Sequence, residues 1–354
     1  MQLFSGDTPL FLAPMAGVTD YAFRTVCAQH GADVTVTEMV SSRALVYQDR
    51  KSRGLLRRNE GSLCGAQIFG NDPAMMAEAA QIAVGISGCD FLDINMGCPM
   101  PKIANNGDGS ALMRDIPLAG RIIRAVADAV SVPVTVKTRL GWDRSCPSAV
   151  ALARAAEENG AAAITVHGRT KAMLYSGRAD WDAIGEVVRA VSIPVIANGD
   201  ISDPEQLLRC RAHSGASLFM AGRAAFGDPW LFERLRAALR GKTPPELPPL
   251  ADRVDTALQQ FALALEDKGE HIACLEARKH FAWYLRGVPH SGFYKEQISN
   301  ISAFSDIERL AKEMGTRITV GHLSADYREL DYTSDSLTKD RQSREGIDAK
   351  AMLS

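Results

Sequence analysis

One cysteine of this chain lies in a short segment whose neighbours suit chemistry better than packing. In DINMGCPMPK (residues 93–102), Cys98 stands between Gly97 and Pro99, and Asn95 lies three residues before it. Glycine permits an unusual backbone turn and proline fixes its own φ, so the thiol is held in a restricted loop. A cysteine that only fills a core needs no such frame, which makes Cys98 a candidate for chemistry.

Other polar or small residues stand where apolar runs of the sequence stop. They are Pro14, Met15, Ala16, Glu38, Gln67, Asn95, Lys137, Arg139, His167, Arg169, Asn198, Gly199, Asp200, Gly222 and Arg223. Each one alone would be unremarkable, because a polar group at the end of a strand is usually a satisfied surface group. They form a site only if the fold brings them to one face of the molecule.

The elements that carry these residues are short β-type runs that alternate with helix-like segments. The runs cover residues 10–15, 34–39, 63–69, 90–95, 134–139, 163–168, 194–199 and 218–222. Asp72-Pro73 and Asp203-Pro204 are typical of helix starts, with an N-cap aspartate before a proline. Eight such units predict a (β/α)8 TIM barrel over residues 1–240, because a doubly wound sheet usually has fewer strands. The glycines of residues 105–113 lack the pattern of a dinucleotide-binding loop.

The pattern changes after the barrel. Residues 241–250 (GKTPPELPPL) are rich in proline and predict a linker. Helical periodicity over 251–268, 271–286 and 303–314 predicts a small helical domain within residues 251–319. Residues 320–354 are polar with few large apolar side chains, so we expect a flexible tail.

Composition limits the class of protein. Hydrophobic residues make up 46% of the 354 residues, and no apolar run approaches the ~20 residues of a membrane span. The N-terminus lacks the basic region of a signal peptide, so we expect a cytoplasmic protein with no membrane association. The seven cysteines are scattered without a CxxC pair, which argues against a disulfide framework or a metal site.

Charge indicates one local feature. The net charge is −2, but residues 42–58 hold six Lys or Arg and one Asp. The segment is either a solvated helix face or a contact for an anionic partner.

The last two clusters of candidate residues indicate a phosphate site. Asn198-Gly199-Asp200 and Gly222-Arg223 follow the seventh and eighth predicted strands, where TIM barrels commonly bind phosphate. Glycine backbones approach phosphate oxygens closely, and Arg223 adds a bidentate donor. At the other end of such a ligand, Lys137 and Gln67 suit a flavin ring, but a Schiff-base lysine, as in a barrel aldolase, fits Lys137 as well.

Seven motifs in series resemble those of the tRNA-dihydrouridine synthases. They are APMAGVTDYAFR, GAQIFG, DINMGCPMPK, VKTRLGWD, TVHGRT, VIANGDI and AGRAAFGDPWLF, and the later ARKHFAWYLRG is similar to the bacterial B subfamily. The resemblance covers roughly residues 8–315 in order. Two departures are Asp108, where a small residue is expected, and the length of the tail after about residue 320.

The resemblance implies an FMN enzyme that uses NADPH to reduce the C5–C6 double bond of a D-loop uridine in tRNA. By position, FMN would contact Pro14, Met15, Ala16, Gln67, Lys137, His167, Asn198, Gly199, Asp200, Gly222 and Arg223. Cys98 would be the proton donor, since a thiol with a pKa near ~8.5 is mostly protonated at neutral pH. Asn95 would hold the uracil, with Arg139 nearby on the substrate side.

An RNA partner implies an RNA-binding surface outside the pocket, because a uridine must leave its stack to reach the mouth of a barrel. We expect the basic segment to follow the second strand on the active-site face. Arg278, Lys279 and Arg286 are expected to face phosphates, so that the helical domain binds RNA and does not cover the flavin. No stable protein partner is expected. The alternatives are a flavin dehydrogenase acting on dihydroorotate or another free pyrimidine, and a non-catalytic tRNA-binding protein.

Overall fold

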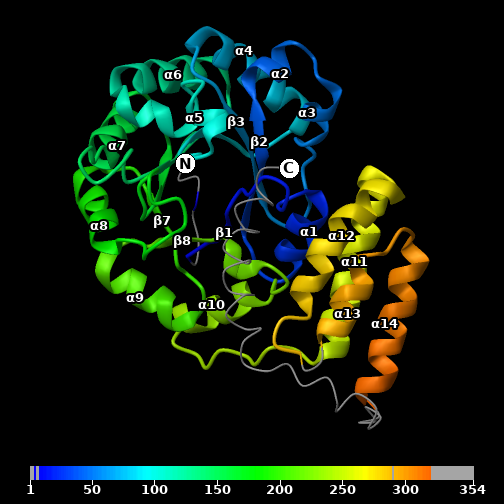
Figure 1. Ribbon diagram of the computed structural model, residues 1–354. Coiled ribbons are helices and arrows are strands. Elements are labelled where there is room, and N and C mark those ends of the chain that lie inside the picture. Colours follow the sequence, from blue (N-terminus) through cyan, green and yellow to red (C-terminus); the bar gives the residue numbers. More distant parts are fainter. Residues whose placement is uncertain (1–3, 5–7, 289–290, 320–354) are drawn as a thin grey trace.

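Eight parallel strands close into a barrel in chain order (Figure 1). The computed structural model describes residue 4, residues 8–288 and residues 291–319. The strands are β1 (Leu10–Leu12), β2 (Val34–Ser41), β3 (Leu63–Phe69), β4 (Phe91–Met96), β5 (Val134–Arg139), β6 (Ala163–His167), β7 (Val195–Asn198) and β8 (Leu218–Ala221). Pairing of β1 with β8 completes the ring. The predicted TIM barrel is confirmed. Each predicted run overlaps one of these strands, although β2 ends two residues and β4 one residue beyond its run.

Helices surround the barrel, and their caps follow the sequence signals. They are α1 (Tyr21–Gln29), α2 (Ser42–Val46), α3 (Arg50–Gly54), α4 (Pro73–Ser87), α5 (Pro101–Ala104), α6 (Ile116–Ala129), α7 (Ala149–Glu158), α8 (Trp181–Ala190), α9 (Pro204–Ser214) and α10 (Leu231–Leu239), with the 3-10 helices η1 (Gly109–Arg114) and η2 (Arg223–Ala225). Asp72 accepts from the Met75 amide at 2.8 Å, and Asp203 accepts from the Gln206 amide at 2.9 Å. Both predicted N-caps are therefore present.

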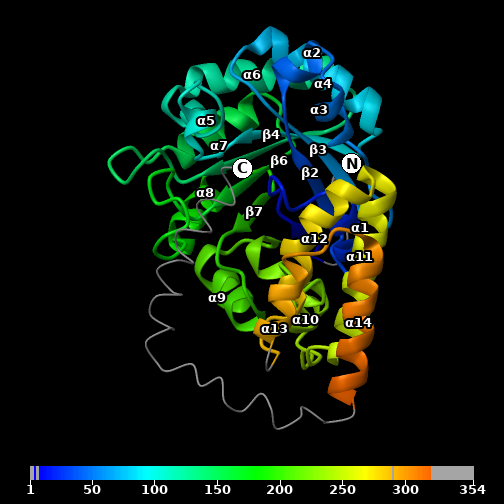
Figure 2. The ribbon, with the colours of Figure 1, turned by 45° about the vertical axis from the view of Figure 1, so that its right-hand side comes forward.

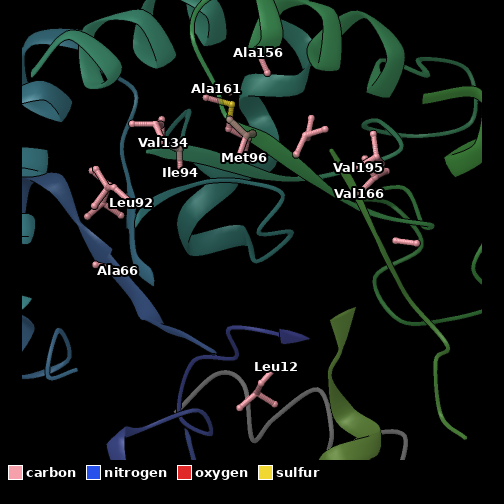
Figure 3. Packing of buried hydrophobic residues seen from close by; sticks show 14 of the residues in the cluster. Leu12, Ala66, Leu92, Ile94, Met96, Val134, Ala156, Ala161, Val166 and Val195 are labelled. Carbon is pink, nitrogen blue, oxygen red and sulfur yellow. The ribbon is translucent and has the colours of Figure 1, made fainter. Parts of the chain in front are cut away.

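Side chains that alternate between the two faces of each strand form two hydrophobic cores, one outside and one inside the barrel. Leu92, Ile94 and Met96 of β4 pack in the large cluster between strands and helices (Figure 3). Phe91 belongs to a second cluster inside the barrel, where a Cβ at Gly65 would come within 2.4 Å of the Phe91 ring. Since successive side chains of a strand point to opposite faces, Asp93 and Asn95 also face the barrel interior. The interior side of β4 thus changes from aromatic to polar toward its carboxyl end.

Four further helices pack beside α1 and the barrel (Figure 2). They are α11 (Leu250–Lys268), α12 (Glu270–Tyr284), α13 (Ser291–Ile298) and α14 (Phe304–Thr319). The described residues 242–249 form neither helix nor strand. The short helix α13 was not expected, because its polar sequence lacks a clear apolar stripe. The exact domain boundaries stay a prediction, and the tail of residues 320–354 lies outside the described residues.

Ion pairs join these helices to the barrel. Lys268 of α11 contacts Asp20, the N-cap of α1, at 2.7 Å and also pairs with Glu276 of α12. Arg57 contacts Asp267 at 2.6 Å. The two carboxylates raise the pKa of Lys268 above its usual value, which keeps this contact charged. Within the described part of the chain, no helix combines the length and apolar character needed to cross a membrane.

Candidate active site

A cavity of about 460 Å³ opens at the carboxyl ends of the barrel strands. Its size is within the range of small-molecule sites, roughly 300–1,000 Å³. Most of the candidate residues line it: Pro14, Met15, Ala16, Gln67, Asn95, Cys98, Lys137, Arg139, His167, Asn198, Gly199, Asp200, Gly222, Arg223 and Arg286. The fold therefore brings together side chains that are up to 272 positions apart in the sequence, from Pro14 to Arg286.

The thiol of Cys98 is held by its own loop. The Cys98 and Gly97 amides donate to the Asn95 side-chain oxygen at 2.9 and 3.2 Å. The Cys98 carbonyl accepts from the Ser110 amide at 3.1 Å. Burial raises the pKa of the half-buried Cys98 thiol above its usual value. The cavity therefore contains a cysteine that keeps its proton at neutral pH.

The reason for glycine at position 97 differs from the one expected. Gly97 does not have the positive φ that would require glycine. A Cβ at this position would lie 3.0 Å from the backbone carbon of Thr138 on β5. Close approach of the cysteine loop to the neighbouring strand, and not a special turn, excludes a side chain here.

Lys137 and His167 have strongly altered proton affinities. The Lys137 ammonium donates to the Asn198 side-chain oxygen at 3.1 Å, while Asn198 donates to the Met220 carbonyl at 2.8 Å. Burial and the nearby Arg139 lower the pKa of Lys137 to about 8. Burial and the surrounding cations lower the pKa of His167 well below its usual value, so its imidazole is neutral at pH 7.

The loop after β7 is held from both sides. The carboxylate of Asp200 makes two 2.8 Å bonds with Arg169 and accepts from the Ala179 amide at 2.7 Å. Its side chain is therefore used within the protein, which leaves its backbone for a ligand. Gly199 has a φ of +111°, and a Cβ there would lie 2.8 Å from a ring carbon of His167. Only glycine suits this position.

Tyr175 and Trp283 are two aromatic residues among the cavity-lining residues that were not predicted from the sequence. The centre of the Tyr175 ring is 4.5 Å from the Arg223 guanidinium and 5.5 Å from that of Arg139. Trp283 of α12 stacks on Phe226, with ring centres 4.2 Å apart. Neither is at a strand end, and Trp283 comes from the helical region, so strand-end reasoning had no signal for them.

The helical region reaches the cavity through Trp283 and Arg286. Buried Arg253 supports this corner by donating to the carbonyls of Tyr284 and Arg286. The helical region therefore does more than flank the barrel: it forms part of the cavity wall.

The other two cations expected to bind RNA have partners inside the protein. Arg278 donates twice to the Ile301 carbonyl, at 3.1 and 2.8 Å. Lys279 donates to the Gly17 carbonyl at 2.8 Å, and the Gly17 amide donates to Glu38 at 2.5 Å. These contacts hold α12 against the α13–α14 connection and against the loop after β1, and neither cation lines the cavity.

The basic segment divides into two parts. Arg43 is exposed on α2, which begins directly at the carboxyl end of β2. Arg50, Lys51 and Arg53 are exposed on α3, the next helix along the chain. Arg58 instead contacts Asp90 at 2.9 Å, just before β4 begins. The expectation that all of 43–58 lies on the active-site face is therefore wrong for its end, because the chain must return to the opposite face to start β3.

Metal ligands do not gather anywhere in the described residues: no group of three His, Cys, Asp or Glu is placed to hold an ion. The seven cysteines are free thiols, five of them buried.

Comparisons with known proteins agree with this geometry. The family model "Dihydrouridine synthase (Dus)" matches residues 11–318. The chain is 44% identical over 295 residues to tRNA-dihydrouridine synthase B of Pseudomonas aeruginosa, covering 82% of this chain and 88% of that protein. It is 45% identical over 303 residues to tRNA-dihydrouridine synthase B of Pseudomonas putida, covering 84% and 88%. A probable tRNA-dihydrouridine synthase of Rickettsia conorii is 40% identical over 292 residues, covering 82% and 88%.

Solved structures share the barrel at low sequence identity. A 6-hydroxypseudooxynicotine amine oxidase from Pseudomonas geniculata has a TM-score of 0.51 at 16% identity, covering 67% of this chain and 49% of that one. A histamine dehydrogenase from a Rhizobium species has a TM-score of 0.50 at 12% identity, covering 72% and 48%. The chain spans about half the length of these two structures, and the likeness concerns the fold alone. From the family match and the curated relatives, the chain belongs to the dihydrouridine synthase family of oxidoreductases.

Proposed function

We propose that this protein reduces the C5–C6 double bond of a D-loop uridine in tRNA, with FMN as cofactor, NADPH as reductant and Cys98 as proton donor. The observation that carries the proposal is a protonated thiol in the same electropositive cavity as the loops after β7 and β8. The names of the curated relatives support tRNA as the substrate.

The cavity suits FMN by its donors and its size. Arg139, Arg223 and Lys137 offer cationic donors, whereas the carboxylate of Asp200 is neutralised by Arg169. The backbone at Gly199 has no side chain between it and the cavity, as close approach of a phosphate requires. Arg223 would bind the phosphate, and Lys137 with Gln67 would face the ring. When bound and reduced by NADPH, FMN supplies the hydride for C6 of the uracil.

The chain's own residues supply the proton and hold the base. The Cys98 thiol keeps its proton because burial disfavours the thiolate, so it acts as a general acid toward C5. Asn95 fixes the Cys98 amide, and its remaining amide hydrogen would be available to the uracil. Arg139 donates to the Gly97, Thr170 and Leu174 carbonyls, which join the cysteine loop to the Tyr175 loop. A base would enter between these two loops.

Exposed cations beside the mouth support an RNA substrate. Burial raises the pKa of Asp108, and the charge of Arg43 partly offsets this rise, so this arginine lies near the loop that follows Cys98. With Arg50, Lys51 and Arg53, it forms a basic surface on α2–α3 that would bind phosphates by counterion release. Arg286 at the cavity rim would contact the RNA on the side of the cavity formed by the helical region. A cytoplasmic location stays a prediction.

The test measures NADPH oxidation and dihydrouridine formation by full-length protein with unmodified tRNA. Cys98→Ala is expected to retain FMN and to be reduced by NADPH, while dihydrouridine formation falls by ~10²–10⁴, the usual contribution of a general acid. Cys146→Ala, at an exposed cysteine outside the cavity, is the matched control and should match the wild type.

Other outcomes would contradict the proposal in distinct ways. Oxidation of NADPH stimulated by free pyrimidines but not by tRNA would indicate a pyrimidine dehydrogenase. Binding of tRNA without any NADPH oxidation would indicate a non-catalytic RNA-binding protein. Wild-type rates in Cys98→Ala would reduce Cys98 to a structural residue.

A further inference from the structure

A buried carboxylate lies beneath the cavity and has no place in the chemistry described so far. Asp93 is 4% exposed in the middle of β4 and does not line the cavity. In the barrel register it stands between Gln67 on β3 and Thr135 on β5. Among the described residues, no Lys or Arg forms a salt bridge with it. Burying an unpaired carboxylate is costly, so its hydrogen bonds must carry its role.

Both oxygens of Asp93 accept hydrogen bonds from neutral donors. The Gln67 side-chain NH₂ donates to one oxygen at 2.6 Å, and the Thr135 hydroxyl donates to the other at 2.5 Å. Both Asp93 oxygens act as acceptors, so the NH₂ end of Gln67 points toward Asp93. Burial raises the pKa of Asp93 above its usual value, and these two bonds and the Lys137 charge only partly offset this rise.

The orientation of Gln67 determines that of Asn95. With its NH₂ toward Asp93, Gln67 presents its oxygen to the Asn95 NH₂ at 3.0 Å. The oxygen of Asn95 is then left to accept the amides of Gly97 and Cys98. An amide turned by 180° fills almost the same space, so only its hydrogen-bond partners decide its orientation. A carboxylate at one end and two backbone N–H groups at the other end require the same orientation.

We propose that Asp93 is a positioning residue that orients the amides of Gln67 and Asn95 and thereby holds the Cys98 loop. The inference deepens the proposed function, since it concerns the thiol assigned there as proton donor. It also sets which atoms Gln67 presents to the cavity, namely one amide hydrogen and one oxygen lone pair. Turning the two amides would place the Asn95 NH₂ against the loop amides, donor against donor, and release the cysteine loop.

The test follows the reactivity of the thiol, which requires no substrate. In a Cys146→Ala background of the full-length protein, Cys98 is the accessible cysteine among the described residues, because the other five are buried. Asp93→Leu removes the acceptor at similar size. Alkylation of Cys98 by iodoacetamide at fixed pH should then accelerate by about tenfold, the factor that the loss of about one hydrogen bond's net stabilisation represents.

Two matched variants separate orientation from general damage. Asp93→Asn should restore slow alkylation, because its oxygen accepts from Gln67 while its NH₂ donates to the Thr135 hydroxyl. Thr135→Val removes the other hydrogen bond to the same carboxylate. It leaves the hydrogen bonds that connect Asp93 through Gln67 to Asn95, so its alkylation rate should match that of the background. Equal acceleration in Thr135→Val and Asp93→Leu would overturn the inference, as would a slow thiol in Asp93→Leu.

Gln67→Met covers the case in which Asp93→Leu does not fold. Gln67→Met removes the side-chain amide that connects Asp93 to Asn95 and should accelerate alkylation similarly. An unchanged rate overturns the inference. Since alkylation is independent of tRNA, this result can fail while tRNA reduction stands, and the reverse also holds. In turnover, Asp93→Leu should lower kcat for tRNA with little change in KM, because the α2–α3 cations proposed to bind RNA are untouched.

Discussion

Binding of FMN should weaken as pH rises from about 7 to 9, because one cavity residue loses its charge in this interval. Lys137 has a pKa of about 8, lowered by burial and by Arg139. Its charged fraction therefore falls from about nine-tenths to about one-tenth, so affinity for an anionic ligand that needs the charge falls by about tenfold, or ~1.4 kcal/mol.

The other cavity groups with a shifted pKa titrate mainly outside this interval. Burial raises the pKa of Cys98 above its usual value, and the pKa of Arg139 is about 10. The pKa of His167 lies well below 6.5, so its imidazole is neutral throughout. A phosphate monoester is ionised above its second pKa of about 6, so the ligand charge is constant too. The pH dependence should therefore belong to Lys137.

The assay titrates apoprotein into FMN and follows quenching of flavin fluorescence at each pH. Lys137→Met should bind weakly at pH 7 and show no further loss at pH 9. Lys242→Met, at an exposed lysine after α10 and outside the cavity, should behave as the wild type. An equal decrease in wild type and Lys137→Met would refute the assignment of the titration to this lysine.

The same titration acts in the opposite direction on folding. The unfolded chain keeps the lysine proton up to a pKa near 10.5, whereas the folded apoprotein releases it near 8. The unfolded state thus binds more protons between these values, so Lys137 makes the free energy of unfolding rise with pH in this window. Denaturant unfolding of apo wild type against apo Lys137→Met tests the sign, and a fall attributable to Lys137 would contradict it.

Three further predictions concern the phosphate loops and the basic surface. Arg223→Ala should weaken FMN binding by ~1.5–3 kcal/mol, the range for a charged hydrogen bond; unchanged affinity in the fluorescence titration would remove this residue from the phosphate site. Gly199→Ala should lower the free energy of unfolding by about 1–3 kcal/mol through backbone strain, because of its φ of +111° and the contact with His167; thermal or denaturant unfolding measures this, and wild-type stability would contradict it. Arg50→Ala with Arg53→Ala should reduce the log–log salt slope of tRNA binding by about one per lost phosphate contact. The same double change at Arg209 and Arg211 of α9 is the control, and equal effects of the two pairs would speak against a specific RNA surface on α3.

Strand positions and helix starts were predictable because they depend on local pattern. Apolar runs of strand length indicate strands that are buried on both faces. Asp-Pro at positions 72–73 and 203–204 indicates the capped start of a helix. Once a parallel barrel is inferred, the carboxyl ends of its strands must share one face. Lys137, His167, Asn198 and the other strand-end residues could therefore be assigned to one cavity without coordinates.

The partners of individual side chains were decided only by the tertiary structure. The sequence by itself determined that Arg278 and Lys279 are cations on a helix, which is equally compatible with RNA phosphates and with carbonyl oxygens of the protein. The folded chain pairs them with Ile301 and Gly17. It likewise turns Arg58 to the far face of the barrel, toward Asp90. Charge and periodicity are properties of a segment, whereas a hydrogen bond requires two groups at one distance and direction.

The cysteine loop shows the same division within the motif itself. The spacing of Asn95, Cys98 and Pro99 along the chain was enough to select Cys98 as the candidate thiol. Two hydrogen bonds, from Gln67 to Asp93 and from Asn95 to Gln67, join β3 and β4. The backbone of β5 excludes a side chain at position 97. These contacts exist because the barrel aligns neighbouring strands in one register and alternates their side chains between two faces. That register is a property of the closed barrel, and no segment of the sequence contains it alone.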